Sequence, residues 1–534
     1  MNNTLRQLFL TFFIGSFLVS CANRGTPSGG PKDEAPPEII KSTPKNYTTN
    51  FKGNQIEIVF NEYIKINNID KQLIISPPMK HKPDISPQSS ASKKILITIK
   101  DTLQPNTTYA FNFGNSIEDY NEGNPFSYYR YVFSTGDYID SLSVKGKIID
   151  AFNKKPETFV NVGLYEVDST YTDSIVYNEV PKYITNTLDS LTTFSIENLK
   201  AGKYLLVALK DNNSDNKFQQ KTDKIGFYKE FITVPNDSSY TIKMFAESVN
   251  FKPSRPRLFS GEKIAFGYEG SSKNMKIDLV TETPEDFEYR ITKDELTDTL
   301  YYWYKPRLEA DSLIFKVTNN DYEKEFTARL SEQKRDSLLL KKYPSGEIAL
   351  DEDFKIFGSV PFYKFDDSKI SIMDKDSASV AFKTSFDTLT NIYNIAFDKT
   401  YENKYNIEVL PEAFTDFFDN TNDSLKYVVN TKKESDYGYA RFTLVNAKFP
   451  IILQLTDNKG ETKIERFADI DKPIEIYNLT PSKYSIRVIF DANGNRKYDP
   501  GVFLKKTQPE EVYYFKEIEV RADWGIEETL TFPE

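Results

Sequence analysis

Apolar and polar residues alternate one by one along this chain, in short runs that recur almost from end to end. Ile56, Ile58 and Phe60 form one such run, and Ile95, Ile97 and Ile99 form another. Alternation with a period of two places every second side chain on the same face of an extended strand, so one face of each run can be buried. Turn-forming clusters separate the runs. Many short strands with frequent turns predict an all-β chain built from sandwiches.

Helical patterning is weak by comparison, because no segment carries a long apolar stripe with a period of 3.6 residues. The best helix candidates are the short piece 411–414 and the stretch 323–341. The second stretch contains the run 336–340 (DSLLL), which is equally compatible with a strand.

Length and charge limit what the chain can be. A chain of 534 residues is too long for a single hydrophobic core, so several domains are expected. Hydrophobic residues make up 39% of the chain, which is enough to fill such cores. The formal net charge of -10 argues against a nucleic-acid partner, since phosphate binding needs a basic face.

The first residues predict a lipoprotein signal. A single arginine precedes a short apolar stretch, which is too short to span a bilayer and reads as a secretory signal. Residues 18–21 (LVSC) resemble a bacterial lipobox and end in Cys21, the only cysteine of the chain. This resemblance implies cleavage before Cys21 and acylation of that residue, which would anchor the protein in a lipid bilayer. The alternative is a soluble secreted protein whose signal happens to end near a cysteine.

The segment that follows the cysteine predicts a tether. Residues 21–37 are rich in glycine, proline and small polar residues, which favours a flexible linker. The triplet Lys32-Asp33-Glu34 resembles the acidic export signals of some Bacteroidota lipoproteins. That resemblance implies a lipid-anchored protein of the outer membrane, with the cell surface favoured over the periplasmic face. A solvated cluster of linker charges is the simpler alternative.

An internal repeat marks the domain boundaries. Segments 198–218 and 478–498 align without a gap, each with an Asn-Leu start, a Lys-Tyr pair, an apolar run and an Asp/Asn-rich end. A weaker match relates 106–135 to 403–431. The chain therefore looks like a pair of modules used twice, with one further β domain between the pairs.

These observations predict seven segments, about five of which are β-sandwiches. In order they are the signal peptide 1–20, the tether 21–37, and sandwiches at 38–137, 138–246, 247–346, 347–433 and 434–534. The first module of the repeated pair covers 38–137 and 347–433, the second covers 138–246 and 434–534, and the middle sandwich is of unknown type. The resemblance described next implies that the first module is Ig-like and the second is transthyretin-like.

The first module resembles the SbsA-type bacterial Ig-like domain. The matching stretches are Pro36-Pro37 to Pro44, 56–62 (IEIVFNE), 103–109 (LQPNTTY), 117–119 (IED) and 132–136 (VFSTG). Together with the lipobox, this layout is similar to Ig-like-domain lipoproteins of Bacteroidota envelopes. The repeated second module resembles transthyretin-type or carboxypeptidase-regulatory sandwiches. The resemblance implies placement in the outer membrane and a binding or scaffolding role, and it brings no catalytic residues.

Two Asp/Asn-rich loops are candidate metal sites. The stronger candidate consists of Asp491, Asn493, Asn495 and Asp499, whose spacing is how a short loop wraps a hard cation such as Ca²⁺. It looks like the calcium loops of adhesin B-repeats, but no EF-hand glutamate stands at position 12. The weaker candidate consists of Asp211, Asn213 and Asp215, with Asp223 as a further ligand. The structural alternative is a pair of Asx turns, which need no metal.

Signatures of catalysis are mostly missing from the sequence. His81 is the only histidine and lies in a loop-like, proline-rich stretch, so zinc hydrolysis and a Ser-His-Asp relay have no support. Phosphate-binding loops are absent from the sequence. No spacing singles out a carboxylate pair for glycoside hydrolysis. We therefore expect a protein that is not an enzyme and that requires no cofactor, with Ca²⁺ as the one ion to consider.

Two functions remain in view. The first is an outer-membrane interaction scaffold that assists an integral β-barrel or an envelope assembly or export complex. The second is a cell-surface glycan-binding lipoprotein, which would use outward aromatic residues from 301–304 or 128–131. For these stretches an aromatic core is the simpler interpretation, and Trp524 is expected in a core or between domains.

Overall fold

The computed structural model describes residues 33–533 apart from 89 and 190, and this part of the chain is almost entirely β. Its only helices are α2 (Ile69–Gln72), α3 (Ile175–Asn178) and two 3-10 turns, η1 (Asp367–Lys369) and η2 (Glu434–Asp436). The expected all-β tandem array of sandwiches is confirmed. None of the described helices is long and apolar enough to cross a membrane.

Both helix candidates are wrong. Residues 411–414 form a turn that enters strand β32 (Phe414–Asp416). The stretch 323–341 begins in β24 (Tyr322–Arg329), continues without a regular element over 330–339 and reaches β25 (Leu340–Tyr343). In β24 and β25, cross-strand pairing outweighs the weak helical propensity of these residues.

The first domain is a sandwich of two sheets. One sheet has the order β1-β2-β5-β4, with β7 also paired to β2, and the other has the order β3-β6-β8. The strands are β1 (Ile39–Thr43), β2 (Gln55–Ile66), β3 (Ile74–Ser76), β4 (Asp84–Ser86), β5 (Ser92–Thr98), β6 (Thr108–Asn112), β7 (Ile117–Asp119) and β8 (Arg130–Ser134).

The second domain also pairs two sheets, β11-β10-β13-β14 with β15 on β13, and β12-β9-β16. Strand β16 runs parallel to β9, and the other pairs are antiparallel. The strands are β9 (Leu142–Asp150), β10 (Asn161–Glu166), β11 (Tyr183–Asn186), β12 (Thr193–Leu199), β13 (Gly202–Lys210), β14 (Lys224–Phe227), β15 (Ile232–Val234) and β16 (Ser239–Met244).

The fifth domain repeats the second strand for strand. Its sheets are β36-β35-β38-β39 with β40 on β38, and β37-β34-β41 with β41 parallel to β34. The strands are β34 (Gly438–Val445), β35 (Ile451–Thr456), β36 (Thr462–Ala468), β37 (Ile474–Leu479), β38 (Ser482–Phe490), β39 (Val512–Tyr514), β40 (Ile518–Val520) and β41 (Gly525–Thr531).

The fourth domain repeats the first in the same way, with sheets β25-β26-β30-β29 and β28-β31-β33. The long strand β2 corresponds here to two strands, so that β32 pairs with β27 as β7 pairs with β2. The remaining strands are β26 (Phe354–Gly358), β27 (Phe362–Phe365), β28 (Ile370–Met373), β29 (Phe382–Asp387), β30 (Ile392–Phe397), β31 (Lys404–Val409) and β33 (Leu425–Asn430).

The third domain has sheets β17-β19-β22-β21, with β18 on β19, and β20-β23-β24. Its strands are β17 (Lys252–Pro253), β18 (Arg257–Ser260), β19 (Lys263–Glu269), β20 (Lys276–Leu279), β21 (Glu288–Lys293), β22 (Thr299–Lys305), β23 (Ser312–Asn319) and β24. Because β25 pairs with β26 of the fourth domain, the boundary between these domains lies before Leu340 and not at residue 346.

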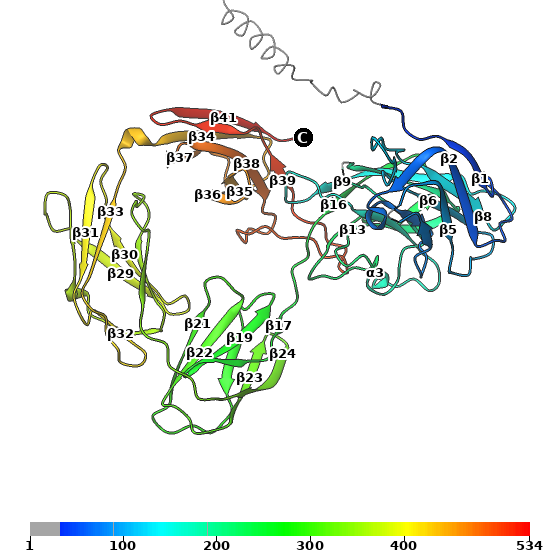
Figure 1. The fold of residues 1–534 in the computed structure, drawn as a ribbon. Helices are drawn as coiled ribbons and strands as arrows, with labels where there is room; N and C mark the ends of the chain where they lie inside the picture. The colour runs from blue at the N-terminus through cyan, green and yellow to red at the C-terminus, as the bar shows by residue number, and fades with distance from the viewer. Residues whose placement is uncertain (1–32, 89, 190, 534) are drawn as a thin grey trace, which may run out of the picture.

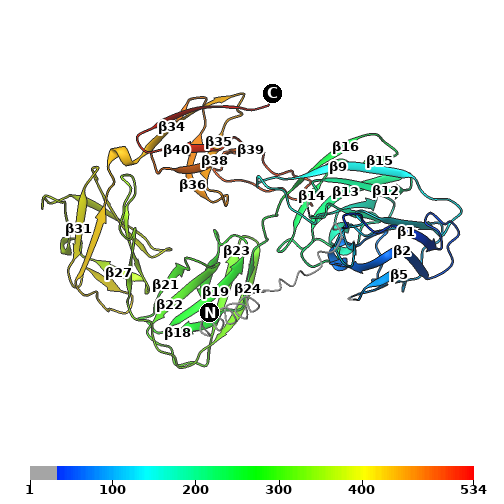
Figure 2. The same ribbon diagram turned by 45° about the horizontal axis from the view of Figure 1, so that its top comes forward.

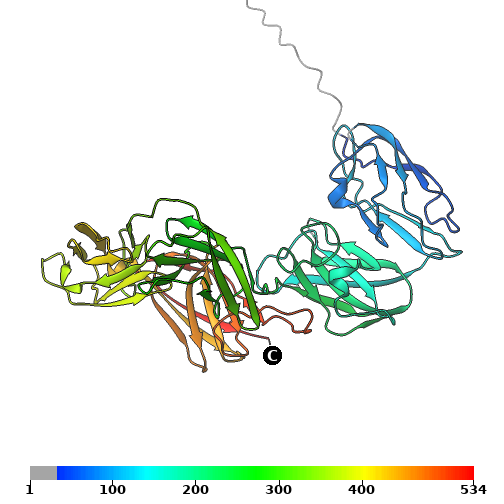
Figure 3. The ribbon, with the colours of Figure 1, turned by 90° about the horizontal axis from the view of Figure 1, so that it is seen from below.

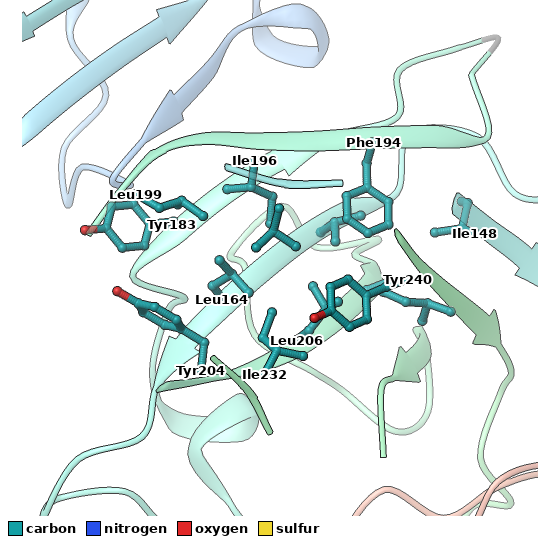
Figure 4. Close-up of a cluster of buried hydrophobic side chains, with 14 of the residues drawn as sticks. Ile148, Leu164, Tyr183, Phe194, Ile196, Leu199, Tyr204, Leu206, Ile232 and Tyr240 are labelled. Atoms are coloured by element: carbon teal, nitrogen blue, oxygen red, sulfur yellow. The ribbon is translucent and has the colours of Figure 1, made fainter. Parts of the chain in front are cut away.

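Strand β13 of the second domain is buried on both faces. Tyr204 and Leu206 point into the sandwich core, and Figure 4 shows them in one cluster with Leu164, Ile196 and Phe194. The alternate residues of the strand enter a separate cluster on the outer face of the same sheet, namely Leu205, Val207 and Leu209. A sheet buried on both faces reads as a continuous apolar run, as 204–209 does.

The second to fifth domains follow one another around a ring, and the first domain lies outside it against the second (Figures 1 and 2). Each junction has its own contacts. Trp303 of the third domain packs with Val360 and Phe417 of the fourth. The Tyr401 hydroxyl of the fourth donates to Asn478 Oδ1 of the fifth at 2.7 Å. Seen from below, the loop between β38 and β39 reaches back to the second domain and closes the ring (Figure 3).

Candidate functional site

The sequence-predicted site residues fall into three places. Cys21 lies outside the described residues, and its acylation stays a prediction. The C-terminal Asp/Asn loop lies between β38 and β39 of the fifth domain, and the first Asp/Asn loop lies between β13 and β14 of the second. The repeat therefore gives the two candidate metal loops equivalent positions in two equivalent sandwiches.

The four residues of the C-terminal loop come together. The side chain of Asp491 is fully buried and accepts the backbone N–H of Asn495 at 3.1 Å and of Arg496 at 2.8 Å. The Asn493 and Asn495 side-chain amides both donate to the Asp499 carboxylate. Asn493 Oδ1 also accepts the Asn495 backbone N–H at 3.0 Å, which is an Asx turn, and together these contacts fix the start of the loop.

A third carboxylate closes this loop from the other end. Glu510 accepts the backbone N–H of Ala492 at 2.9 Å and of Asp499 at 3.0 Å. Burial raises the pKa of Glu510, and the nearby Asp499 and Asp491 raise it further. Within the described residues no group of three acidic, histidine or cysteine side chains is placed to hold a metal ion. Calcium binding therefore stays a prediction.

The first loop is folded by the same kind of turn. Asp211 accepts the backbone N–H groups of Asn213, Ser214 and Asn216 at 2.7 to 3.0 Å. Asp215 instead accepts the Lys217 backbone N–H and the Gln219 side chain, so the two carboxylates hold different parts of the loop. Burial raises the pKa of Asp211, with Asp215 and Asp223 adding to the shift.

Calcium titration tests both loops. If the C-terminal loop binds Ca²⁺ with the dissociation constant of about 10⁻⁴ to 10⁻³ M that extracellular modules show, a tenfold excess over that constant adds about 1.4 kcal/mol of stability. We expect millimolar Ca²⁺ to raise the melting temperature, and Asp499→Asn to abolish the rise. Equal concentrations of Mg²⁺ provide the control. An unchanged melting temperature at 10 mM Ca²⁺ would leave the loops as Asx turns only.

The C-terminal loop differs from its counterpart in length. The loop between β13 and β14 covers 211–223, whereas the loop between β38 and β39 covers 491–511 and is eight residues longer. Since the repeat aligns without a gap through Tyr498, the extra residues lie within 499–511. There Val502 and Thr507 bridge to form a small hairpin that presents Phe503.

Phe503 inserts into the second domain and is completely buried there. Its ring packs against Phe227 at 5.3 Å and Tyr177 at 6.4 Å between ring centroids, within the cluster on the outer face of β13. The backbone N–H of Phe503 donates to the buried carboxylate of Glu247, and the Gln508 side chain donates to the Phe227 carbonyl at 3.1 Å. Phe503 thus completes a hydrophobic cluster that belongs to another domain.

The second domain also inserts a side chain into the fifth domain. Phe152, in the loop after β9, lies 4.6 Å from the Tyr498 ring and 4.1 Å from the Arg487 guanidinium of the fifth domain. The Tyr514 hydroxyl donates to the Phe152 carbonyl at 2.7 Å. We call these reciprocal insertions, centred on Phe503 and Phe152, the clasp.

Two charged groups belong to the buried part of the clasp. Arg487 is only 3% exposed and donates to Gln454, Tyr514 and Thr462, so its charge is held by hydrogen bonds as well as by the Phe152 ring. Lys506 Nζ lies 3.8 Å from the Phe503 ring centroid and 3.6 Å from Asp173 of the second domain. Burial lowers the pKa of Lys506.

Sequence reasoning missed the clasp. Neither Phe503 nor Phe152 carries a motif, and each residue alone looks like ordinary strand or loop hydrophobicity. The sequence signal that could have revealed it is the insertion after the aligned repeat, within 499–511. An apolar residue in an inserted surface loop needs a partner elsewhere.

The remaining aromatic candidates divide between core and surface. Tyr302, Trp303 and Tyr304 are buried, and Lys263 Nζ lies 4.4 Å from the Trp303 ring centroid. This stretch therefore serves the core of the third domain and, through Trp303, its junction with the fourth. Tyr128 is 43% exposed, whereas the nearby Tyr131 is fully buried.

The sequence also predicted the surroundings of Trp524 and His81. Trp524 is 66% exposed, so the expectation that it lies in a core or between domains is wrong. It directly precedes β41, at the start of an edge strand. His81 lies in an exposed loop, as expected, with Nδ1 at 2.6 Å from Asp101 Oδ1.

Comparison with known proteins identifies part of the chain. Residues 33–135 match the family described as bacterial Ig-like domain. No curated protein matches the chain. Similar solved structures include domains 1–6 of the surface layer protein SbsC, with 12% identity over 90% of this chain and 67% of that one and a TM-score of 0.16.

Two further solved structures are also similar to this chain. The titin fragment I67–I69 has 15% identity over 53% of this chain and 98% of that one, with a TM-score of 0.12. The Bacillus anthracis TIE protein has 10% identity over 95% of this chain and 75% of that one, with a TM-score of 0.14. These scores are too low to describe a shared arrangement of domains, and no function is transferred from them.

Proposed function

We propose that this protein is a non-catalytic interaction scaffold of the bacterial outer membrane, anchored by lipid on Cys21. The observation that carries the proposal is the clasp. Domains joined by short linkers move relative to one another unless their interfaces are large and apolar. Here the eight extra residues of the loop between β38 and β39 attach the fifth domain to the second. This attachment favours a platform of constant shape over a flexible string of domains.

The partner we propose is an integral outer-membrane β-barrel or a complex that assembles or exports envelope proteins. The match of 33–135 to a bacterial Ig-like domain supports a role at the cell envelope. The net charge of -10 argues against direct adsorption to anionic lipid, so attachment would depend on the acyl chains and on the partner.

Purification from membranes tests this role. We expect the full-length tagged lipoprotein, extracted in mild detergent, to bring down at least one barrel protein in a stoichiometric amount. A Phe503→Ala variant should recover less of it, because the platform loses its fixed shape. A Leu504→Ala variant provides the matched control, since Leu504 is 52% exposed beside Phe503. Recovery of the lipoprotein alone would contradict the proposal.

The second candidate function is glycan binding at the cell surface. The aromatic stretch 301–304 no longer supports it, because most of its rings are buried. Tyr128 does support it, because this exposed ring lines a cavity beside the second domain.

A further inference from the structure

Two cavities flank the junction between the first and second domains. One has a volume of about 230 Å³ and the other of about 480 Å³, and both are lined by Ile74, Ile184 and Asn186. They therefore lie on either side of a shared wall and form one interrupted groove, which we call the junction groove. The floor is made where edge strands β3 and β11 meet, with the Ile184 N–H donating to Ser76 Oγ at 3.1 Å.

A chain of amides lines the larger cavity. Asn186 Nδ2 donates to Asn161 Oδ1 at 2.6 Å, and Asn161 Nδ2 donates to Asn216 Oδ1 at 2.9 Å. Each side-chain amide has two N–H donors and two acceptor lone pairs, so these bonds orient the groups without using all of them. A row of fixed groups that both donate and accept matches the hydroxyl groups of a sugar.

Several charges of the groove are paired within it. Arg130 forms an ion pair with Glu197 in the smaller cavity, and Lys82 forms one with Asp70 at 3.0 Å in the larger. The Asp211 carboxylate is occupied by backbone N–H groups of its own loop. Lys71 and Lys210 also line the larger cavity and form no ion pair among the described residues, so three lysines face two carboxylates there. This near balance of charge favours a neutral ligand.

Three bulky residues that line the groove have left-handed backbone conformations. Their φ angles are 59° at Tyr128, 53° at Phe159 and 56° at Leu188. Large side chains rarely adopt positive φ, and such outliers concentrate at ligand sites, where surrounding structure holds them in place. At Tyr128 this conformation leaves an aromatic ring 43% exposed at the groove, where a sugar ring can stack on it.

We propose that the junction groove binds a neutral, polyhydroxylated glycan chain. A peptide would most simply add as a strand to a sheet edge, but the edges here, β3 and β11, cover each other. The inference goes beyond the scaffold role and rests on the second candidate function, to which it gives a site. The amides of Asn161, Asn186 and Asn216 bind the hydroxyl groups, and Tyr128 stacks on a ring.

Affinity electrophoresis of the full-length lipoprotein in mild detergent tests the groove. The gels contain dextran, mannan, galactomannan or arabinoxylan, with alginate as the acidic counterpart. We expect at least one neutral polysaccharide to retard the protein, and alginate not to. Tyr128→Gly should weaken this retardation at least tenfold while the melting temperature stays the same or rises, because glycine adopts positive φ without strain. Asn186→Ala should weaken it as well.

Tyr477→Ala is the control variant, because Tyr477 is 63% exposed on β37 of the fifth domain, which contributes no residue to the lining of the groove. It should leave the retardation unchanged. Retardation by none of the four neutral polysaccharides, by alginate alone, or equally in the wild type and in both groove variants would overturn the assignment. No membrane partner takes part in this measurement, so its failure leaves the scaffold proposal standing, and a failed co-purification leaves the groove standing.

Discussion

Replacing Phe503 with alanine should open the ring. Truncating a fully buried phenylalanine costs about 3–5 kcal/mol, through lost transfer free energy and the cavity that remains. All of that loss falls on the contact between the second and fifth domains, because Phe503 has no place in the core of its own sandwich. Small-angle X-ray scattering should show a larger radius of gyration, while circular dichroism retains the β signal of intact sandwiches.

Leu504→Ala is the matched control for this experiment. Leu504 is the next residue and is 52% exposed, so its truncation should change stability by no more than about 0.5 kcal/mol and leave the scattering curve unchanged. If Phe503→Ala scatters like the wild type, the ring is held by other contacts. Phe152→Ala then distinguishes the two halves of the clasp. Combined with Phe503→Ala it should cost less than the sum of the single changes, since an open ring has already lost the Phe152 contacts.

Replacing Cys21 with serine should remove the lipid anchor and release the protein from the membrane, except for the fraction that the proposed barrel partner retains. Serine lacks the thiol that the predicted acylation requires. Fractionation should move the protein from the membrane pellet to the soluble fraction. Mass spectrometry of the wild type should show an acylated N-terminal cysteine.

Ser20→Ala is the control for this change, because it keeps a small residue before the cysteine and should leave the protein in the membrane. An unmodified thiol in the wild type, with the protein free in the culture fluid, would refute the anchor. The same result would contradict the part of the proposed function that places the scaffold at the outer membrane.

Through the clasp, the two copies of the duplicated second module contact each other. In a string of sandwiches each domain contacts only its neighbours, so a second copy of a module would merely lengthen the array. Here the fifth domain contacts the second, its own repeat counterpart, through the part of the loop that the second domain lacks. Because both partners belong to one chain, the association is intramolecular and needs only a modest interface.

The sequence alone determined the fold class and the repeat. In a strand every second side chain lies on the same face, so alternation with a period of two, as in 56–60, predicts a strand with one buried face. Strand β2 forms there. The segments that repeat 280 positions apart in the sequence lie in two sandwiches with the same strand order. The weak helix candidates failed because propensity over a few residues decides little once a strand partner is available.

Tertiary structure alone decided which surfaces meet. The clasp joins residues 256 to 362 positions apart, and the junction groove exists only because β3 and β11 lie side by side. Local patterning is set by neighbours in sequence and is therefore readable there. The contact between Phe503 and Phe227 depends instead on the orientations of the intervening domains, which no short stretch of sequence specifies.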